Sequence, residues 1–410
     1  MLSSTFPYPP SRGGTEIRTF NLLKYLHQKH FVTLIVQRQE EVFDAEVEEL
    51  RKWVSDLVVF PFAQTQPVAG IGGFLGKLGR FTESMIKATP PNVLYRYSPD
   101  IQAWVDASVK AEKYDVITCE HSVNEIYIRP DFRNCVRTVV NIHSSVSGWI
   151  RNHLEMGASP NALRDRLYLS LLLDRYEKRY CAKFSSIVVT TEDDRQQFLK
   201  LRPDIQIEVI SNGVDLDLFP ARPDDPGGHR LIFVGAMDAS HNIDAARFFA
   251  IDVLPEVQKR YPDATLSIVG TRPAATVQEL SRRPGIIVTG AVPSVTEHLN
   301  QSTVCVVPLR AGFGIKNKTL EAMAAGVPLV ASDRGLEGLA VDCTGVPRRA
   351  LRANIPAEYV NAISQLFDNP QLRSELSCNG RQLVQTQYTW ESAGQRYEQV
   401  LLPAAIAAAL

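Results

Sequence analysis

V-V-P-L-R-A-G-F-G-I-K-N-K-T-L-E-A-M-A-A-G-V-P-L-V-A-S-D-R-G-L-E-G-L is the sequence of residues 306–339. Apolar runs on either side of a glycine loop and an amphipathic segment predict a strand, a loop, a helix and a second strand. We place the first strand at Val304–Leu309, the helix at about Asn317–Ala325 and the second strand at Pro328–Ala331. Strands that alternate with helices favour a parallel α/β sheet.

Three glycines and one asparagine fix the predicted ends of these elements. Gly312 and Gly314 suit a loop that needs positive φ or a close approach of the backbone to a ligand. Asn317 is a typical N-cap residue. Gly326 lies where a left-handed residue ends a helix.

The charges at the start of this helix suggest a bound anion. Lys316 and Lys318 lie at the end whose free N–H groups are already partly positive, which costs roughly 0.3–1 kcal/mol each. An anion such as a phosphate would offset that cost. Glu321 lies on the same helical face as Lys318 and could accept hydrogen bonds from ligand hydroxyls. The alternative is a solvated Lys/Glu pair on an ordinary helix.

The stretch resembles the C-terminal signature of the family-4 retaining glycosyltransferases, in particular a bacterial branch with G-I-K-N-K before L-E-A-M-A. The resemblance implies two Rossmann-like domains facing each other across a cleft (the GT-B fold), with a C-terminal helix crossing back. Many members have two glutamates eight positions apart, one on the donor sugar and one on the ribose. Glu321 matches the second, but Phe313 occupies the first position. The sugar would then be held by the loop amides of Gly314, Ile315 and Asn317 and by Lys316.

Length and composition indicate a soluble two-domain protein. The chain has 410 residues, 45% of them hydrophobic and 22% charged, with a net charge of −1. A chain so nearly neutral has no overall basic field for nucleic acid. Its six cysteines are scattered without metal-ligand spacing, which favours free thiols in a reducing cytoplasm. We find no signal peptide or long apolar run, and the early first strand suggests a start that is short relative to related proteins.

A turn and a proline-rich segment mark the domain boundary. Asn212 and Gly213 lie in V-I-S-N-G-V-D-L-D-L-F, which resembles the family's interdomain signature, and prolines follow at 220–228. We predict an N-terminal acceptor-side domain at 1–213, a linker at 214–229, a donor domain at 230–388 and a crossover helix and tail at 389–410. Asp215 and Asp217 have D-x-D spacing but lack the strand–loop context of a metal site.

In the N-terminal half, the first loop and two strand ends carry candidate site residues. Gly13 and Gly14 precede a helix in a loop that resembles the family's P-P-x-x-G-G, which faces the donor diphosphate. No G-x-G-x-x-G follows the first strand, so a dinucleotide-binding domain is unsupported. Glu120 and His121 follow a predicted strand at Tyr114–Cys119.

His143 follows the predicted strand Val136–Ile142. Ligands of open α/β sheets bind beyond the carboxyl ends of the strands. A structural hydrogen bond is the alternative for either histidine. The resemblance implies a polar residue against the donor sugar or acceptor here, and His143 and Glu120 fit that role better than His121.

Residues 69–87 combine apolar positions at helical spacing with interleaved lysine and arginine. This pattern is typical of a membrane-surface helix and also of a helix packed on its own domain. The resemblance implies that the region shapes the acceptor site and contacts a lipid-linked acceptor. The predicted location is therefore the cytoplasm, with the inner face of the plasma membrane as an alternative.

In the C-terminal half, a strand at Leu231–Val234 ends at Gly235, and Asn242 is expected to cap the next helix. Many related enzymes grip the diphosphate with an arginine and a lysine in this loop, and neither is present. The resemblance therefore moves that role to Lys316 and Lys318, with Arg310 as a further candidate. Backbone groups near Thr271, Arg272 and Gly290 would hold the nucleobase.

The sequence thus predicts a retaining glycosyltransferase that moves a hexose from a nucleotide-diphospho-sugar to a hydroxyl acceptor. Its product would be a cell-surface polysaccharide or glycolipid, made without metal or cofactor. A nucleotide-sugar 2-epimerase or a phosphorylase on the same fold is one rival. A non-catalytic relative that binds a lipid or another transferase is the other.

Overall fold

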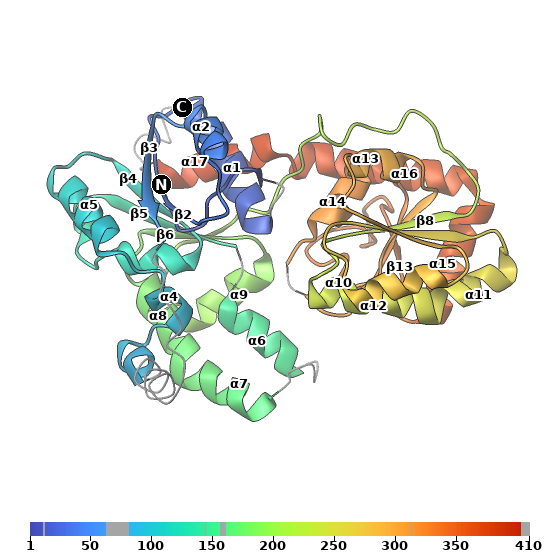
Figure 1. Ribbon diagram of the computed structural model, residues 1–410, viewed down its shortest axis with the longest axis horizontal. Helices are drawn as coiled ribbons and strands as arrows, with labels where there is room; N and C mark the ends of the chain where they lie inside the picture. The colour runs from blue at the N-terminus through green and yellow to red at the C-terminus, as the bar shows by residue number, and fades with distance from the viewer. Residues whose placement is uncertain (11–12, 63–81, 144, 156–160, 313, 403–410) are drawn as a thin grey trace. The chain divides into compact units, whose positions relative to one another are not determined.

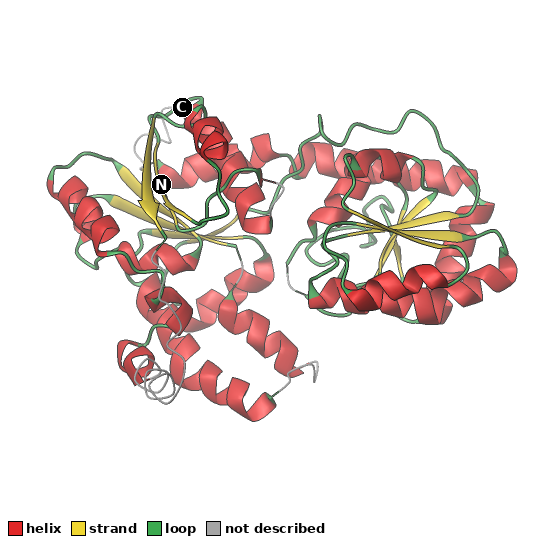
Figure 2. Cartoon of the chain, in the orientation of Figure 1, coloured by secondary structure: helices red, strands yellow, loops and turns green. Residues whose placement is uncertain are grey.

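The structure is a computed structural model that describes residues 1–10, 13–62, 82–143, 145–155, 161–312 and 314–402. The chain divides into two compact units. Unit 1 comprises Met1–Ser211 and Ala393–Leu410, and unit 2 comprises Asn212–Ser392. Each unit contains one parallel sheet with helices packed on both of its faces (Figures 1 and 2).

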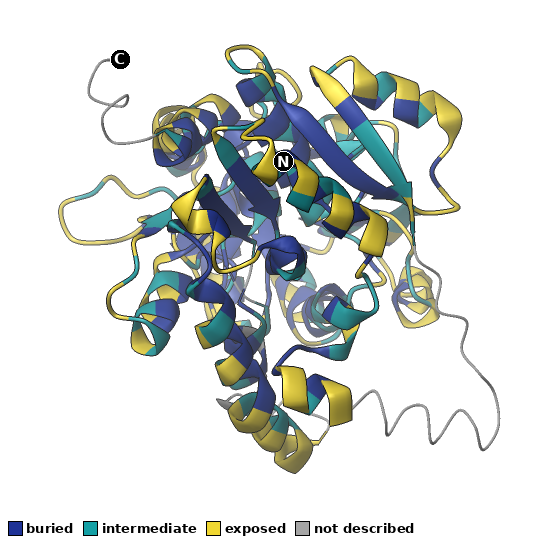
Figure 3. Cartoon of the chain, turned by 90° about the vertical axis from the view of Figure 1, so that its left-hand side faces the viewer, coloured by how far each residue is buried: buried dark blue, intermediate teal, exposed yellow. Residues whose placement is uncertain are grey.

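The sheet of unit 1 has the order β3-β2-β1-β4-β5-β6-β7. Its strands are β1 (Leu2–Ser3), β2 (Thr33–Arg38), β3 (Asp56–Pro61), β4 (Val116–Glu120), β5 (Arg137–Ile142), β6 (Ser186–Val189) and β7 (Ile207–Val209). β4, β5 and β6 are almost entirely buried, because helices cover both faces of the sheet. Figure 3 shows buried strands of this unit in dark blue.

The helices of unit 1 are α1 (Gly14–His27), α2 (Asp44–Arg51), α4 (Pro91–Leu94), α5 (Pro99–Lys110), η2 (Ser122–Tyr127), η3 (Phe132–Asn134), α6 (Val146–Glu155), α7 (Ala162–Tyr168), η4 (Leu169–Leu173), α8 (Asp174–Cys181) and α9 (Glu192–Leu201). Residues 82–87 form a further short helix. The final helix α17 (Trp390–Leu401) begins in unit 2 and continues into unit 1.

The sheet of unit 2 has the order β10-β9-β8-β11-β12-β13. Its strands are β8 (Arg230–Val234), β9 (Thr265–Val269), β10 (Ile286–Gly290), β11 (Val304–Val307), β12 (Leu329–Ala331) and β13 (Leu351–Arg352). Its helices are α10 (Ser240–Phe248), η5 (Phe249–Val253), α11 (Leu254–Arg260), α12 (Ala275–Gln278), η6 (Glu279–Arg282), α13 (Val295–Asn300), α14 (Asn317–Ala324), α15 (Pro356–Asp368) and α16 (Pro370–Gln387).

In both sheets the strand order reverses direction beside the first strand of the unit. The reversal lies between β1 and β4 in unit 1 and between β8 and β11 in unit 2. At such a point, loops leave the carboxyl ends of two neighbouring strands in opposite directions and open a crevice for ligands. The site residues predicted after β4, β8 and β11 therefore lie at the expected edges of the two sheets.

The stretch that begins at β11 has the predicted order of elements, with one correction at its helix. Gly312 (φ 114°), Gly314 (φ 78°) and Gly326 (φ 70°) all have positive φ, which confirms their predicted conformations. The N-cap of α14, however, is the extended residue Lys316 and not Asn317, and no side chain caps this helix end. The side chain of the N-cap residue therefore accepts no hydrogen bond from the N–H groups at the start of α14.

Two long helical segments each contain one turn of π-helix. These turns are η4 between α7 and α8, and η5 between α10 and α11. Asn242 was expected to cap the second of these helices, but it lies inside α10, after the N-cap Ala239. Its side chain is thereby free to contact the neighbouring loop and helix α14.

Candidate active site

The ammonium of Lys318 lies at the reversal point of unit 2. Its Nζ donates a hydrogen bond to Oδ1 of Asn242 at 2.5 Å and lies 4.7 Å from the centroid of the Phe233 ring. A Cβ atom on Gly235 would lie 2.6 Å from the same Nζ. The glycine that follows β8 therefore leaves the space in which the ammonium of Lys318 is held.

Burial changes the protonation of Lys318 and its neighbour Glu321. Burial lowers the pKa of Lys318 to about 7, although Glu321 acts in the opposite direction. Burial likewise raises the pKa of Glu321 to about 7, against the effect of Lys318. Both residues are partly buried rather than fully buried. An anion at this point would favour the charged form of Lys318.

Lys316 is held by protein groups. Its Nζ donates to Oε2 of Glu337 at 3.0 Å and also to the carbonyl oxygen of Gly314. Glu337 further accepts a hydrogen bond from Nη1 of Arg334 at 3.1 Å. The side chain of Lys316 is only 10% exposed. In this structure Lys316 therefore braces the glycine loop from inside, whereas Lys318 points to the reversal point.

Arg310, the third predicted cation, is paired at the surface. Its Nε donates to Oδ2 of Asp244 at 2.9 Å, and its guanidinium lies 4.8 Å from the centroid of the Phe248 ring. About half of each charged side chain in this pair is exposed. Arg310 would have to leave Asp244 to reach a phosphate.

Backbone groups meet closely where β8, β9 and β10 end. A Cβ atom on Gly270 would lie 1.7 Å from the carbonyl oxygen of Gly235, so only glycine fits there. The carbonyl oxygen of Thr271 accepts a hydrogen bond from the amide of Met237 at 2.9 Å. Gly290, with φ 69°, has open space where a side chain would be. The loops after β8, β9 and β10, where the nucleobase was predicted to bind, thus bring backbone groups close together.

Arg272 lies in the same region but is engaged by an acid. It has a positive φ of 49°, and its Nε donates to Oδ2 of Asp238 at 2.5 Å. The side chain is well exposed, and Asp238 has a lowered pKa because it accepts this hydrogen bond. The structure therefore offers the backbone of Arg272 for contacts and leaves its guanidinium on Asp238.

In unit 1, Glu120 is the centre of a buried polar network. Its Oε1 accepts a hydrogen bond from the hydroxyl of Tyr397 at 2.8 Å, and its Oε2 accepts one from Nδ2 of Asn141 at 2.7 Å. Asn141 in turn accepts from Nε of the buried Arg18 at 3.0 Å. Burial alone would raise the pKa of Glu120, but the nearby His143 and these hydrogen bonds hold it below its ordinary value.

His143 lies beside this network, with a side chain that is 9% exposed. Its Nε2 is 3.6 Å from Oε2 of Glu120, which is too long for a hydrogen bond, and neither ring nitrogen has a hydrogen-bond partner among the described residues. Burial lowers the pKa of His143 despite the neighbouring carboxylate. A neutral imidazole with two unused nitrogens can donate to one ligand atom and accept from another.

His121 stands edge-on to His143, with ring centroids 5.4 Å apart. Its φ is 72°, an unusual value for a residue other than glycine and one that occurs at ligand sites. Burial, and after it His143, lowers the pKa of His121 to about 3. The structure therefore brings Glu120, His121 and His143 together at the end of β4 and β5.

The glycines before α1 lie at a helix start that also carries an acid. Gly13 is the extended N-cap of α1, and Gly14 is its exposed first residue. A Cβ atom on Gly13 would lie 2.7 Å from Oε2 of Glu16, so this carboxylate already lies beside the first turn. Residues 11–12 of the same loop, and Phe313 of the donor loop, lie outside the described residues.

Several residues of these clusters were not predicted. Asn242 was expected to be a cap, and Arg18, Asn141 and Tyr397 had no assigned role. The signal for Asn242 was weak, because an asparagine near a helix start fits a cap equally well. Arg18 and Tyr397 lie on helices whose sequence gives no indication of a distant buried carboxylate.

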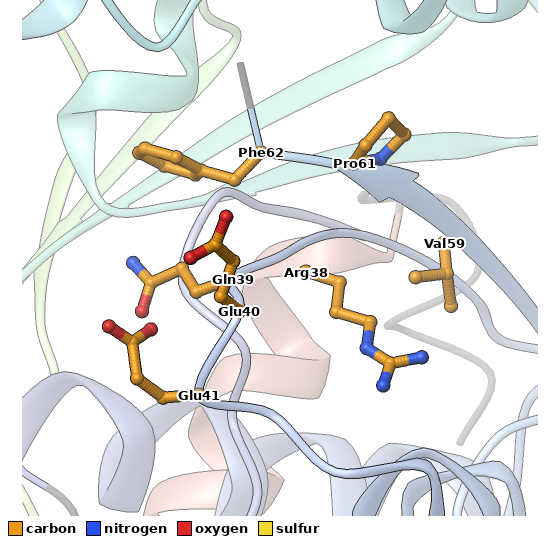
Figure 4. A pocket seen from close by; sticks show the side chains of 7 residues that line it. All are labelled: Arg38, Gln39, Glu40, Glu41, Val59, Pro61 and Phe62. Carbon is orange, nitrogen blue, oxygen red and sulfur yellow. The ribbon is translucent and has the colours of Figure 1, made fainter. Parts of the chain in front are cut away.

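A pocket of about 690 Å³ lies at the ends of β2 and β3 (Figure 4). Its walls include Arg38, Glu40 and Phe62, and none of the predicted site residues.

Within the described ranges, we find no cluster of three or more His, Cys, Asp or Glu side chains suited to a metal ion. The same ranges contain no helix that is both long and apolar enough to cross a membrane.

Comparisons with known proteins place these two units in a family. The model described as Glycosyltransferase Family 4 matches residues 12–218, and the one described as Glycosyl transferases group 1 matches residues 228–369. A protein described as "Uncharacterized 44.6 kDa protein in cps region" from Klebsiella pneumoniae is 21% identical over 399 residues, with 95% of each chain covered.

Two further matches have assigned activities. A GDP-mannose-dependent alpha-(1-6)-phosphatidylinositol monomannoside mannosyltransferase from Mycolicibacterium smegmatis is 26% identical over 228 residues, 48% of this chain and 57% of that protein. The solved structure of sucrose-phosphate synthase from Thermosynechococcus elongatus has a TM-score of 0.66 at 19% identity, over 100% of this chain and 99% of that one. With a family model matched over half of its length, the chain belongs to glycosyltransferase family 4 and has the GT-B fold.

Proposed function

We propose that the protein is a retaining, metal-independent hexosyltransferase that uses a nucleotide-diphospho-sugar donor and a hydroxyl acceptor. The observation that carries this proposal is the ammonium of Lys318, held in the space left by Gly235 at the reversal point of unit 2. Departure of a nucleoside diphosphate develops negative charge, which a fixed cation and helix N–H groups stabilise. Unit 2 is accordingly the donor side and unit 1 the acceptor side.

The remaining donor contacts follow from the loops around Lys318. The amides of Gly314, Ile315 and Asn317 at the start of α14 would bind phosphate oxygens, and Glu321 would accept from the ribose. Lys316 would hold the loop in shape and add its charge to the site. The backbone of Thr271, Arg272 and Gly290 would hold the base, and Gly13 and Gly14 would approach the diphosphate from α1.

Retention is supported by the state of the carboxylate in unit 1. Glu120 is 1% exposed and already accepts hydrogen bonds from Tyr397 and Asn141, so it is poorly placed to attack a sugar. We infer a front-face reaction, in which a phosphate oxygen of the leaving group takes the acceptor proton. The neutral imidazole of His143 would position a sugar or acceptor hydroxyl, with His121 beside it.

The acceptor is proposed to be lipid-linked, and the product a cell-surface polysaccharide or glycolipid. The name of the M. smegmatis relative specifies a phosphatidylinositol-based acceptor, which supports this assignment. We propose that the enzyme works at the cytoplasmic face of the plasma membrane, with contact through residues 69–87. Of these, residues 69–81 lie outside the described residues, and Ile86 and Lys87 are exposed on the helix that follows.

Binding of nucleoside diphosphates tests the function directly. We expect one of UDP, GDP, ADP and dTDP to raise the melting temperature without added metal, because the nucleotide binds the folded protein and not the unfolded chain. Lys318→Ala should abolish both this shift and sugar transfer, while its melting temperature without ligand stays nearly unchanged. A fully active Lys318→Ala enzyme would refute the proposal, and no shift with any nucleotide would favour a non-catalytic relative.

A further inference from the structure

An exposed stripe of leucines runs along one part of unit 1. It lies on the consecutive helices α7, η4 and α8 (residues 162–181), which are called the arm below. Leu163, Leu167 and Leu171 follow one another at intervals of four residues on α7 and η4, and they are 71%, 51% and 49% exposed. Residues four apart lie on the same face of a helix. The α7 end of the arm projects away from the sheet of unit 1 (Figure 1). None of the three leucines belongs to the buried core of that unit.

The same face carries positive charge without matching acids. Arg166, Arg175 and Lys178 are exposed along the arm, and no described carboxylate forms an ion pair with them. The acids of the arm are engaged elsewhere. Asp165 pairs with Arg164, Asp174 pairs with Arg151, and Glu177 is buried under two serines.

The three leucines and these three cations are named the leucine–arginine face. Apolar side chains flanked by arginine and lysine suit the surface of an anionic bilayer, where leucines enter the headgroup boundary and cations meet lipid phosphates. A second copy of the chain fits less well, because a two-fold contact would bring the same unpaired cations against one another. Exposed apolar patches of this kind mark interaction surfaces.

A second exposed apolar residue lies next to this arm. Helix 82–87 and α8 line one pocket together, with Glu83 and Lys87 on the helix and Arg179 on α8. A hydrogen bond of 2.9 Å from Nη2 of Arg179 to Oγ1 of Thr89 fixes the chain just after that helix. Ile86, on the exposed side of the helix, is 78% exposed. Unit 1 therefore carries a second exposed apolar residue, Ile86, on an element that shares a pocket with α8.

We propose that the leucine–arginine face docks unit 1 on an anionic membrane. This surface adds to the contact proposed above for residues 69–87, and in that sense it rests on the membrane part of the proposed function. It depends on neither the donor site nor the chemistry of transfer. Its test therefore measures vesicle binding, and nucleotide binding is measured separately.

The test is cosedimentation of the full chain with vesicles. We expect binding to vesicles that contain phosphatidylglycerol, weaker binding to phosphatidylcholine alone, and weakening by salt. The triple variant Arg166→Glu/Arg175→Glu/Lys178→Glu should lose on the order of a hundredfold in affinity for the anionic vesicles. Leu163→Ser/Leu167→Ser/Leu171→Ser should also lose binding.

A matched control changes exposed apolar residues of unit 2, as Leu218→Ser with Ile355→Ser, and should bind as the parent does. Equal vesicle binding by the charge variant and the parent would overturn the proposal. It would also be overturned if the leucine variant altered only self-association in sedimentation velocity. Vesicle binding by a chain that shows no nucleotide shift would leave this surface standing and count against the transferase.

Discussion

Gly235 and Lys318 show how one missing side chain can make a charged site. The ammonium needs the volume that a Cβ atom on Gly235 would take, and Asn242 supplies its hydrogen-bond acceptor. Burying a cation with a single neutral acceptor disfavours its charged form, which is why the pKa of Lys318 falls to about 7. Such an arrangement costs stability unless an anion binds, which is the property expected of a ligand site.

We predict that Gly235→Ala weakens nucleoside diphosphate binding without unfolding the protein. The new Cβ atom would lie 2.6 Å from Nζ of Lys318 and 2.9 Å from Nδ2 of Asn242, so the flexible lysine must move away. Loss of one charge-assisted hydrogen bond should cost about 1.5–3 kcal/mol, roughly ten- to a hundredfold in Kd. Calorimetric titration measures the loss, and the melting temperature without ligand is the control. Unchanged affinity would contradict the role of this space.

Diphosphate affinity should also depend on pH through Lys318. In the free protein the charged fraction of Lys318 falls as pH rises through about 7, whereas a bound diphosphate keeps the proton on the lysine. Affinity should therefore decline with rising pH above about 7, by at most about tenfold per pH unit, where the ligand's phosphates are already ionised. Titrations at several pH values measure the slope, and Lys318→Ala should bind weakly and lose this decline, although Glu321 still titrates near pH 7. A pH-independent parent would refute this reading.

At the residue scale, the sequence predicts backbone conformation better than side-chain partners. Gly312, Gly314 and Gly326 have the positive φ values expected of them, because the preference of glycine for that region is a local property. Asn242 was misassigned because its partner lies on α14, far along the chain. Phe313 lies outside the described residues, and the consequence of its replacing a glutamate stays a prediction.

At the scale of elements, α17 is attached to unit 1 through one buried face. A Cβ atom on Gly394 would lie 2.3 Å from Cγ of Tyr25, so α17 packs closely on α1. Glu398 on the same face accepts hydrogen bonds from Tyr25 at 3.0 Å and Lys29 at 3.3 Å, and lies 2.6 Å from Nε2 of His30. The C-terminal helix expected from the family resemblance therefore has a specific anchor.

We predict that Glu398→Gln lowers the free energy of unfolding by about 1–2 kcal/mol at pH 7. Burial alone would raise the pKa of Glu398, but its contacts with His30, Tyr25 and Lys29 outweigh that and lower it. A carboxyl whose folded pKa is lowered stabilises the fold above its unfolded pKa, and this stabilisation disappears as pH falls through the folded value. The difference between variant and parent should therefore vanish below about pH 4.

Urea denaturation at several pH values measures this difference. Glu391→Gln is the matched control, because Glu391 is exposed on the same helix and should leave stability unchanged. A loss of stability that persists at acid pH would indicate a packing defect rather than the lost carboxylate.

Strands and helices were predictable where their patterns are local, and their irregularities were not. β5 and β8 begin within one residue of their predicted starts, because each is an apolar run between polar boundaries. The π turns η4 and η5 give no signal in the sequence, since one extra residue in a turn hardly disturbs the apolar spacing. The network around Glu120 was also unpredictable, because it joins α1, β5 and α17, which lie far apart in sequence.

At the scale of the whole molecule, the two units repeat one strand order around separate cores. The core of unit 1 includes Val140 and Tyr180, and that of unit 2 includes Phe233 and Leu320. The proposed donor site around Lys318 belongs to unit 2, and the contacts of Glu398 that anchor α17 belong to unit 1. Stability effects at the two places should therefore act on different cooperative units.

This separation predicts two unfolding transitions in scanning calorimetry. A saturating nucleoside diphosphate should raise chiefly the free energy of unfolding of unit 2, by about 2.7 kcal/mol at a hundred times its Kd, because most of the proposed contacts, including Lys318 and the start of α14, belong to that unit. Glu398→Gln should lower only the transition of unit 1, since Tyr25, Lys29 and His30 belong to that unit. A single transition that both changes shift would mean that the two sheets unfold as one cooperative body. A variant at the Lys318 site or at the anchor of α17 would then change the stability of both units together.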